Sequence, residues 1–138
     1  MHRFPLKTTL IIAFPLLFAT HLPARAESEK ETAETFTLTG DAERGAVIYR
    51  QYCISCHGET GRGDGPAGRR LRPRPYDLSD AGKMATVSDQ EIFTAIKEGG
   101  ASVGKSIFMT SFKGVLSDEQ IHDVAVFVRS LATPGDPP

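Results

Sequence analysis

Two cysteines and a histidine share the five-residue stretch Cys53-Ile54-Ser55-Cys56-His57, and these cysteines are the only two in the chain. Residues three apart lie on one face of a helical turn, so both thiols point the same way. Thiols arranged in this way reach the two vinyl groups of one haem and form thioethers, and the histidine that follows them binds the iron. The stretch therefore predicts haem c, one per chain, attached through Cys53 and Cys56 and ligated by His57.

Three other uses of these residues fit the sequence less well. A redox-active dithiol of the thioredoxin type requires a βαβ setting, which the sequence lacks. A structural zinc site requires four ligands, and the adjacent Cys56 and His57 make poor tetrahedral partners. A disulfide between residues only three apart would be strained. Covalent haem remains the interpretation that the spacing favours.

Residues 1–26 have the three parts of a secretory signal peptide: a basic start, the apolar run Leu10–Ala19, and small residues at Ala24 and Ala26. The alternative is a membrane anchor. The apolar run is about ten residues long and contains Pro15, whereas a spanning helix needs about 20 residues. We therefore expect export to the periplasm, cleavage, and no membrane span afterwards.

The charge that remains after cleavage excludes one class of partner. The leader takes three of the 16 Lys and Arg residues with it, which leaves 13 basic against 17 acidic residues. This net negative charge gives no reason to expect nucleic acid as a partner.

With 40% apolar and 24% charged residues, the chain has the composition of one globular domain. We expect a monomer.

Capping residues and apolar spacing predict three helices. Each begins at or after a residue whose side chain caps a helix N-terminus, and the second and third also have a glutamate or glutamine in capping-box position. Apolar residues in the third recur three and four apart, as on one helix face. The helices are 41–53 with Asp41 as cap, 89–98 with Ser88, and 118–132 with Ser117.

No stretch alternates as a half-buried strand does, so the predicted fold class is all-α. Residues 40–132 form the predicted domain, between a flexible N-terminal tail over 27–39 and a proline-rich C-terminal tail over 133–138. The loop over 58–80 is unusually long for a compact domain. Because three short helices give a thin core, a large apolar cofactor inside the domain is a reasonable expectation.

An ordered series of motifs runs from residue 40 to residue 131. The motifs are GDAERG at 40–45, CISCH at 53–57, Gly61, Gly63, Gly65 and Pro66, SIFMTSF at 106–112, and LSDEQI at 116–121. In this order they resemble those of the class I cytochrome c family of small single-haem proteins. The resemblance implies a cytochrome c-like fold, with three main helices and long loops wrapped around one covalently attached haem. It also implies that the first and last helices cross, with Gly45 packed against Phe127.

The sixth iron ligand has three candidates after residue 26: Met84, Met109 and His122. His122 follows a residue of the apolar stripe of the last helix and is expected to be solvent-facing or half-buried there. Met84, just before the second helix, is expected to fill the core. Met109 lies between Phe108 and Phe112 in a loop, where aromatic neighbours shield a haem from water, and it matches the family's ligand position. We expect Met109 to be the ligand.

The resemblance implies two further details of the ligands. The family often has proline directly after this methionine, and Thr110 stands there, so the loop is expected to be less rigid and the bond to iron weaker. The Pro66 carbonyl is expected to accept the second ring N–H of His57, which would orient the imidazole.

Five arginines form the one local charge cluster of the sequence. They leave three interpretations open: a solvated loop, ion pairs with haem propionates, or a docking patch for an acidic redox partner. We expect Arg74 to bind the cofactor, and Tyr76 is a candidate hydrogen-bond donor to a propionate. The cluster is Arg62, Arg69, Arg70, Arg72 and Arg74.

These residues predict a periplasmic electron carrier rather than an enzyme. A haem ligated by His57 and Met109 has no free position for a substrate, and this ligand pair raises the reduction potential. The expected partners are redox proteins that donate and accept one electron. The alternatives are a haem subunit fixed to a periplasmic oxidoreductase and, with a labile sixth ligand, a gas or redox sensor.

Overall fold

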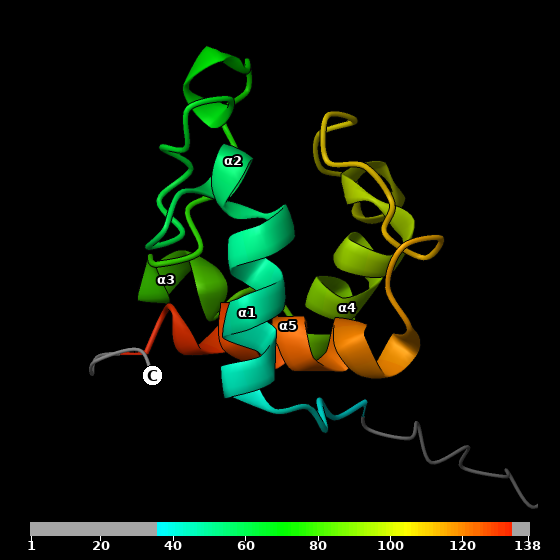
Figure 1. Cartoon of the computed structure of the whole chain (residues 1–138). Coiled ribbons are helices and arrows are strands. Elements are labelled where there is room, and N and C mark those ends of the chain that lie inside the picture. Colours follow the sequence, from blue (N-terminus) through cyan, green and yellow to red (C-terminus); the bar gives the residue numbers. More distant parts are fainter. Residues whose placement is uncertain (1–35, 134–138) are drawn as a thin grey trace, which may run out of the picture. The chain divides into compact units, whose positions relative to one another are not determined.

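The computed structural model describes residues 36–133, and these form helices and loops without a strand (Figure 1). The all-α prediction is therefore confirmed. The predicted signal peptide 1–26, most of the predicted N-terminal tail and residues 134–138 lie outside the described residues. The elements are α1 (Ala42–Tyr52), α2 (Ile54–His57), the 3₁₀ turn η1 (Gly68–Arg70), α3 (Ala81–Met84), α4 (Asp89–Glu98), the 3₁₀ turn η2 (Gly100–Val103) and α5 (Asp118–Ser130).

The three predicted helices are α1, α4 and α5, and their caps are formed as the sequence predicts. The Asp41 and Ser88 side chains each accept a hydrogen bond from a backbone N–H in the first turn of α1 and α4. At α5, Ser117 and Gln120 bond reciprocally in a full capping box. Helix α5 ends at Ser130, two residues earlier than predicted. Of the two four-residue helices, α2 corresponds to the helical turn expected for the stretch 53–57, and α3 was not predicted, because one turn is too short to show an apolar period.

Helices α1 and α5 cross at Gly45, as the family resemblance implies (Figure 1). A Cβ atom built on Gly45 would collide with the Asp123 carbonyl oxygen and lie 2.9 Å from Phe127 Cβ. One turn further along α1, the Tyr49 ring lies 5.1 Å from the Phe127 ring. The glycine thus lets two helix backbones approach closely enough for these aromatic rings to pack.

The segment before α1 differs from the predicted flexible tail. Residues 36–39 belong to that predicted tail, yet Leu38 packs against the core. The Phe36 ring lies 5.4 Å from Phe93 of α4 and stacks at 5.7 Å on His122 of α5. Both apolar residues gain burial through these contacts, which the charged composition of the rest of the tail conceals.

Asp123 is the one buried charged residue in the part of the chain that the structure describes. Its carboxylate accepts hydrogen bonds from Arg44 Nε at 2.8 Å, Arg44 Nη2 at 2.9 Å and the Asp41 backbone N–H at 2.6 Å. The hydrogen bond from Arg44 holds the pKa of Asp123 below its ordinary value, against the opposing effect of burial. The pair therefore fastens the start of α1 to the middle of α5.

Asp123→Ala is expected to lower the free energy of unfolding by about 1–3 kcal/mol at pH 7, because it leaves the Asp41 N–H without its acceptor. Because the pKa of Asp123 is lowered in the folded protein, this stabilisation is fully present above about pH 3.9, the pKa of an aspartate in the unfolded chain. It is lost as the pH falls through the lower pKa that Asp123 has in the folded protein. Urea unfolding at pH 7 and pH 3 measures both effects. The control is Asp118→Ala, whose 64%-exposed carboxylate pairs with Lys97 and is expected to contribute less than about 1 kcal/mol. An Asp123→Ala loss of the same size at both pH values would contradict this account.

No helix between residues 36 and 133 combines the length and the apolarity needed to cross a membrane.

Candidate functional site

A cavity of about 760 Å³ with mostly apolar walls lies among α1, α2, α4, α5 and two loops. Its volume is within the range of about 300–1,000 Å³ that is usual for cofactor and ligand sites. Cys53, Cys56 and His57 line it, and so does Met109 from the loop after η2. The structure thus brings four of the predicted site residues to one cavity. Helices α4 and α5 contribute Ile92, Ile96, Val124 and Val128 to its walls.

The two cysteines lie on a nearly continuous helical path. Helix α1 ends at Tyr52, and the Cys53 N–H still bonds to the carbonyl oxygen of Tyr49 at 2.8 Å. The His57 N–H bonds to the Cys53 carbonyl oxygen at 2.9 Å, which closes the single turn of α2. Both thiols are half-buried and free, with no disulfide between them. Burial, together with the charge of Cys56, raises the pKa of the Cys53 thiol to about 12.

The His57 imidazole is held in its neutral form, because burial lowers its pKa. The backbone of Tyr76 opposes this shift by accepting from the imidazole, which identifies the acting group as the Tyr76 carbonyl. His57 Nδ1 is buried, and no acceptor among residues 36–133 lies at the distance and angle of a hydrogen bond to it. The bond from His57 to the Pro66 carbonyl therefore stays a prediction, and Tyr76 is the residue whose backbone acts on the imidazole here.

The long loop over 58–80 packs on the backbone of α2 directly after Pro66. The Ala67 N–H bonds to the Ser55 carbonyl oxygen at 2.9 Å. A Cβ atom on Gly68 would collide with the Cys56 carbonyl oxygen, so this turn needs a glycine. The loop later returns to His57 at Tyr76, ten residues beyond Pro66. Two hydrogen bonds keep the loop compact, from the Gly63 N–H to His57 O and from the Leu78 N–H to Gly61 O, both 2.8 Å.

Met109 is positioned by its own backbone. Its carbonyl oxygen accepts from the Gly100 N–H at 2.9 Å, and its N–H bonds to Ser106 O at 3.2 Å. A Cβ atom on Gly100 would lie 3.1 Å from Met109 Cβ, so the loop packs tightly on η2. Residues 106–109 thereby follow the rim of the cavity, and the Met109 side chain is half-buried in its wall.

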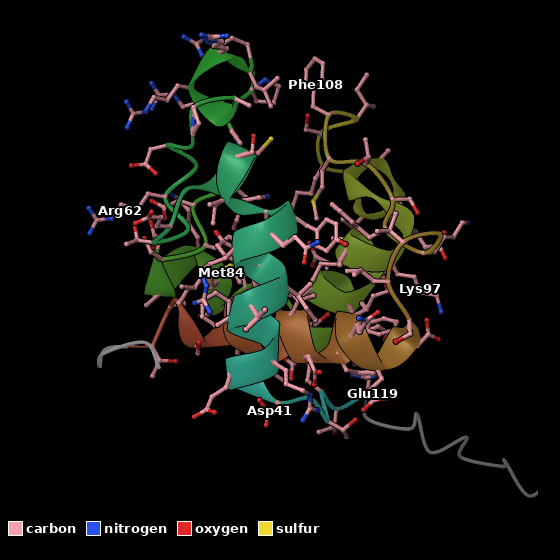
Figure 2. The ribbon with its side chains drawn as sticks, viewed as in Figure 1. Asp41, Arg62, Met84, Lys97, Phe108 and Glu119 are labelled. Carbon is pink, nitrogen blue, oxygen red and sulfur yellow. The ribbon has the colours of Figure 1, made fainter. Side chains whose placement is uncertain are left out.

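The other two candidates for the sixth ligand lie differently. Met84 also lines the cavity, but it is 2% exposed and belongs to the core cluster (Figure 2). His122 does not line the cavity, and its half-buried ring packs against Phe36 and Phe93. Its placement on α5 agrees with the expectation of a half-buried helix histidine.

The five arginines of the cluster do not gather at one site. Arg72 and Arg74 line the cavity, Arg62 lines a second, smaller hollow beside α1, and Arg69 and Arg70 line neither. Tyr76 also lines the cavity, and its hydroxyl donates a long hydrogen bond of 3.4 Å to the Lys83 carbonyl oxygen.

Sequence reasoning missed two charged residues of the cavity wall, Glu91 and Lys105. Lys105 Nζ lies 3.1 Å from the Glu91 carboxylate and 5.2 Å from the centre of the Tyr76 ring. These contacts join α4, the loop after η2 and the loop before α3. No sequence signal predicts them, because the three residues are far apart in the chain and each is common on protein surfaces.

The donor set of this cavity fits a c-type haem. It combines two free thiols three residues apart, a neutral imidazole directly after them, and a thioether from another wall of the same apolar space. The thiols suit thioether bonds to the macrocycle, and the imidazole and the methionine sulfur are both established axial donors to haem iron.

Comparison with known proteins agrees with this reading. The family model described as cytochrome c oxidase, cbb3-type, subunit III matches residues 40–128. A solved structure named KustC0563 c-type cytochrome is 28% identical with a TM-score of 0.52, and the match covers 64% of this chain and 98% of that one. A chain of the Kuenenia stuttgartiensis reducing HAO-like protein complex Kustc0457/Kustc0458 is 25% identical with a TM-score of 0.54. That match covers 70% of this chain and 45% of the other.

Comparison with the curated proteins gives no significant match. The family model nevertheless spans well over half of the chain, including every helix except the last two residues of α5. The protein therefore belongs to the family of single-haem c-type cytochrome domains that this model describes, with covalently bound haem c and the role of an electron carrier rather than an enzyme.

Proposed function

We propose that this cytochrome is an exported, monomeric shuttle that passes one electron at a time between redox partner proteins in the periplasm. In this proposal Cys53 and Cys56 tether the haem, and His57 and Met109 are the two axial ligands. The supporting observation is that all four residues line one and the same mostly apolar cavity, with Met109 on a different segment from the other three.

The bound haem supplies a one-electron Fe(III)/Fe(II) couple. The chain's own residues prepare the site for it. Burial keeps His57 neutral and therefore able to donate a lone pair. Tight packing of the Met109 loop on Gly100 keeps Met109 in the cavity wall. The apolar side chains of α4 and α5 exclude water, which favours the form of the site with less charge.

The proposal assigns further roles to the ends of the chain and to the rim of the cavity. Residues 1–26 are the signal peptide, which directs export and is removed, and residues 40–132 are the functional domain. The signal-peptide pattern in the sequence supports this assignment. Arg74 and Tyr76 line the cavity, where a guanidinium and a hydroxyl are suitable partners for haem propionates.

A second candidate function is that of a haem subunit fixed in an oxidoreductase complex. Two observations favour it: one similar structure comes from a multiprotein complex, and Ile107 and Phe108 are 77% and 51% exposed. A permanent interface buries about 800 Å² per partner or more. Two exposed side chains on one loop are a small part of such an area, so the shuttle remains the proposal.

A potentiometric titration of the haem-loaded protein tests the shuttle, with size-exclusion chromatography of material purified under native conditions. We expect one reversible wave that fits a single electron, no loss of haem between cycles, and elution as a monomer. Elution in a stable complex with another protein would establish the subunit. A multi-electron wave or haem release on reduction would contradict an electron carrier.

A further inference from the structure

We propose that one end of this cytochrome, built from an arginine-rich loop and an apolar tip on either side of the haem cavity, is a docking surface for a redox protein with an acidic patch. The Arg-rich loop is residues 69–74, and the apolar tip is Ile107 and Phe108. The proposal rests on the proposed carrier function and names the chemistry of the partner.

The Arg-rich loop has four arginines in six residues, and all four are exposed. Arg69 Nε donates a hydrogen bond of 2.6 Å to the Asp64 carbonyl oxygen, and its guanidinium lies 4.0 Å from the Asp64 carboxylate. The Arg72 guanidinium donates to the carbonyl oxygens of Arg69 and Leu71, so its charge is not neutralised by a carboxylate. The loop therefore presents four positive charges, and of these only Arg69 is paired with a carboxylate among residues 36–133.

The apolar tip belongs to the loop that follows η2. Ile107 is 77% and Phe108 51% exposed, and both also line the cavity. Figure 2 shows Phe108 at the outer end of that loop, at the same end of the domain as the green turn of η1. Large apolar side chains at such exposure cost free energy in water, and a covering partner removes that cost.

The two parts meet at the cavity. Arg72 and Arg74 line it from one loop, and Ile107 and Phe108 line it from the other. A protein seated across both parts is therefore brought beside the cofactor site. An apolar contact surrounded by complementary charge also gives the fast association and small contact area that a transient electron-transfer complex needs.

Charge complementarity selects an acidic partner over a basic one. The chain as a whole is net negative, and more so without residues 1–26. The negative net charge of the chain would attract a basic partner, whereas the positive charge of the Arg-rich loop attracts an acidic one. The local surface and the whole molecule thus predict opposite signs, and this opposition allows a decisive experiment.

The experiment uses the haem-loaded protein on gold electrodes coated with carboxylate-terminated or ammonium-terminated alkanethiols. At 0.01 M salt, where charges act over about 30 Å, we expect adsorption and a reversible one-electron response on the carboxylate surface. The response should be lost at 1 M salt, where the range falls to about 3 Å. Adsorption on the ammonium surface alone would overturn the proposal.

Two matched pairs of variants locate the surface. Arg69→Gln with Arg70→Gln is expected to lower the adsorbed signal on carboxylate by on the order of tenfold. Arg50→Gln with Arg62→Gln makes the same change of charge beside the second hollow and is expected to alter the signal less than about twofold. An equal loss in both pairs would overturn the proposal, because the response would then follow net charge.

The apolar tip is tested on a mixed carboxylate and methyl surface. Ile107→Ser is expected to lower the adsorbed signal several-fold, whereas Val115→Ser, which changes a 58%-exposed residue outside the cavity wall, leaves it unchanged. No difference between these two variants would remove the tip from the proposal. Retention of the protein by vesicles of anionic phospholipid at 0.15 M salt would assign the surface to a membrane and overturn the protein partner.

Failure of this proposal is distinguishable from failure of the carrier function. A protein without a reversible one-electron couple in solution would fail as a carrier, whatever surface it adsorbs to. A protein with a normal couple in solution that avoids the carboxylate surface would remain a carrier, and only the acidic docking partner would be wrong.

Discussion

Replacing both Cys53 and Cys56 with alanine is expected to abolish covalent attachment of haem. The thiols are the only two in the chain, and both line the cavity as free side chains. Without them no thioether forms, and the haem is held only by its axial ligands and by apolar contacts. Each single variant keeps one thiol and is expected to retain one thioether. The measurement is the mass of the exported protein after denaturation.

Ser55→Ala is the matched control, because this residue lies on the same turn but is exposed and outside the cavity wall. We expect it to carry the full mass of polypeptide plus haem. The double cysteine variant should have the mass of the polypeptide alone. A haem that stays bound to the denatured double variant would refute attachment through these cysteines.

Met109→Ala is expected to open the sixth position of the iron, whereas Met84→Ala is expected to destabilise the protein and leave the ligands intact. Both methionines line the cavity, but Met84 is 2% exposed within the core. Its truncation removes buried volume and should lower the free energy of unfolding by about 2–5 kcal/mol. Loss of the Met109 sulfur should lower the reduction potential by on the order of 0.1 V, because axial ligands set much of that potential.

Carbon monoxide binding separates the two variants. The reduced Met109→Ala protein should bind carbon monoxide readily, and the reduced Met84→Ala protein should not. The opposite result would make Met84 the ligand and Met109 a packing residue. Free binding by the unmodified protein would favour the sensor, in agreement with a ligand loop that has Thr110 where the family often has proline.

The sequence predicts those parts of the fold that depend on neighbouring residues. Ser117 and Gln120 form their capping box because both partners lie within one turn, and local spacing is enough to find them. The crossing at Gly45 was also predictable, although only through the family resemblance. A lone glycine in a helix otherwise carries no information about what packs on it.

The contacts that the sequence does not predict form between residues that are far apart along the chain. The Tyr76 carbonyl comes near His57 only because the intervening loop packs on α2, and that path cannot be read from composition. Lys105 reaches Glu91 and Tyr76 from a separate loop. Phe36 was missed for a related reason: its burial depends on the space between α4 and α5, not on its charged neighbours.

The most direct test of the central claim is the absorption spectrum of the oxidised, haem-loaded protein through the near infrared. Ligation by His57 and Met109 predicts a low-spin spectrum with a methionine-to-iron charge-transfer band, which disappears in Met109→Ala and persists in Met84→Ala. A high-spin spectrum without that band would show that no methionine binds the iron and would contradict the account of this protein as a closed-site electron carrier.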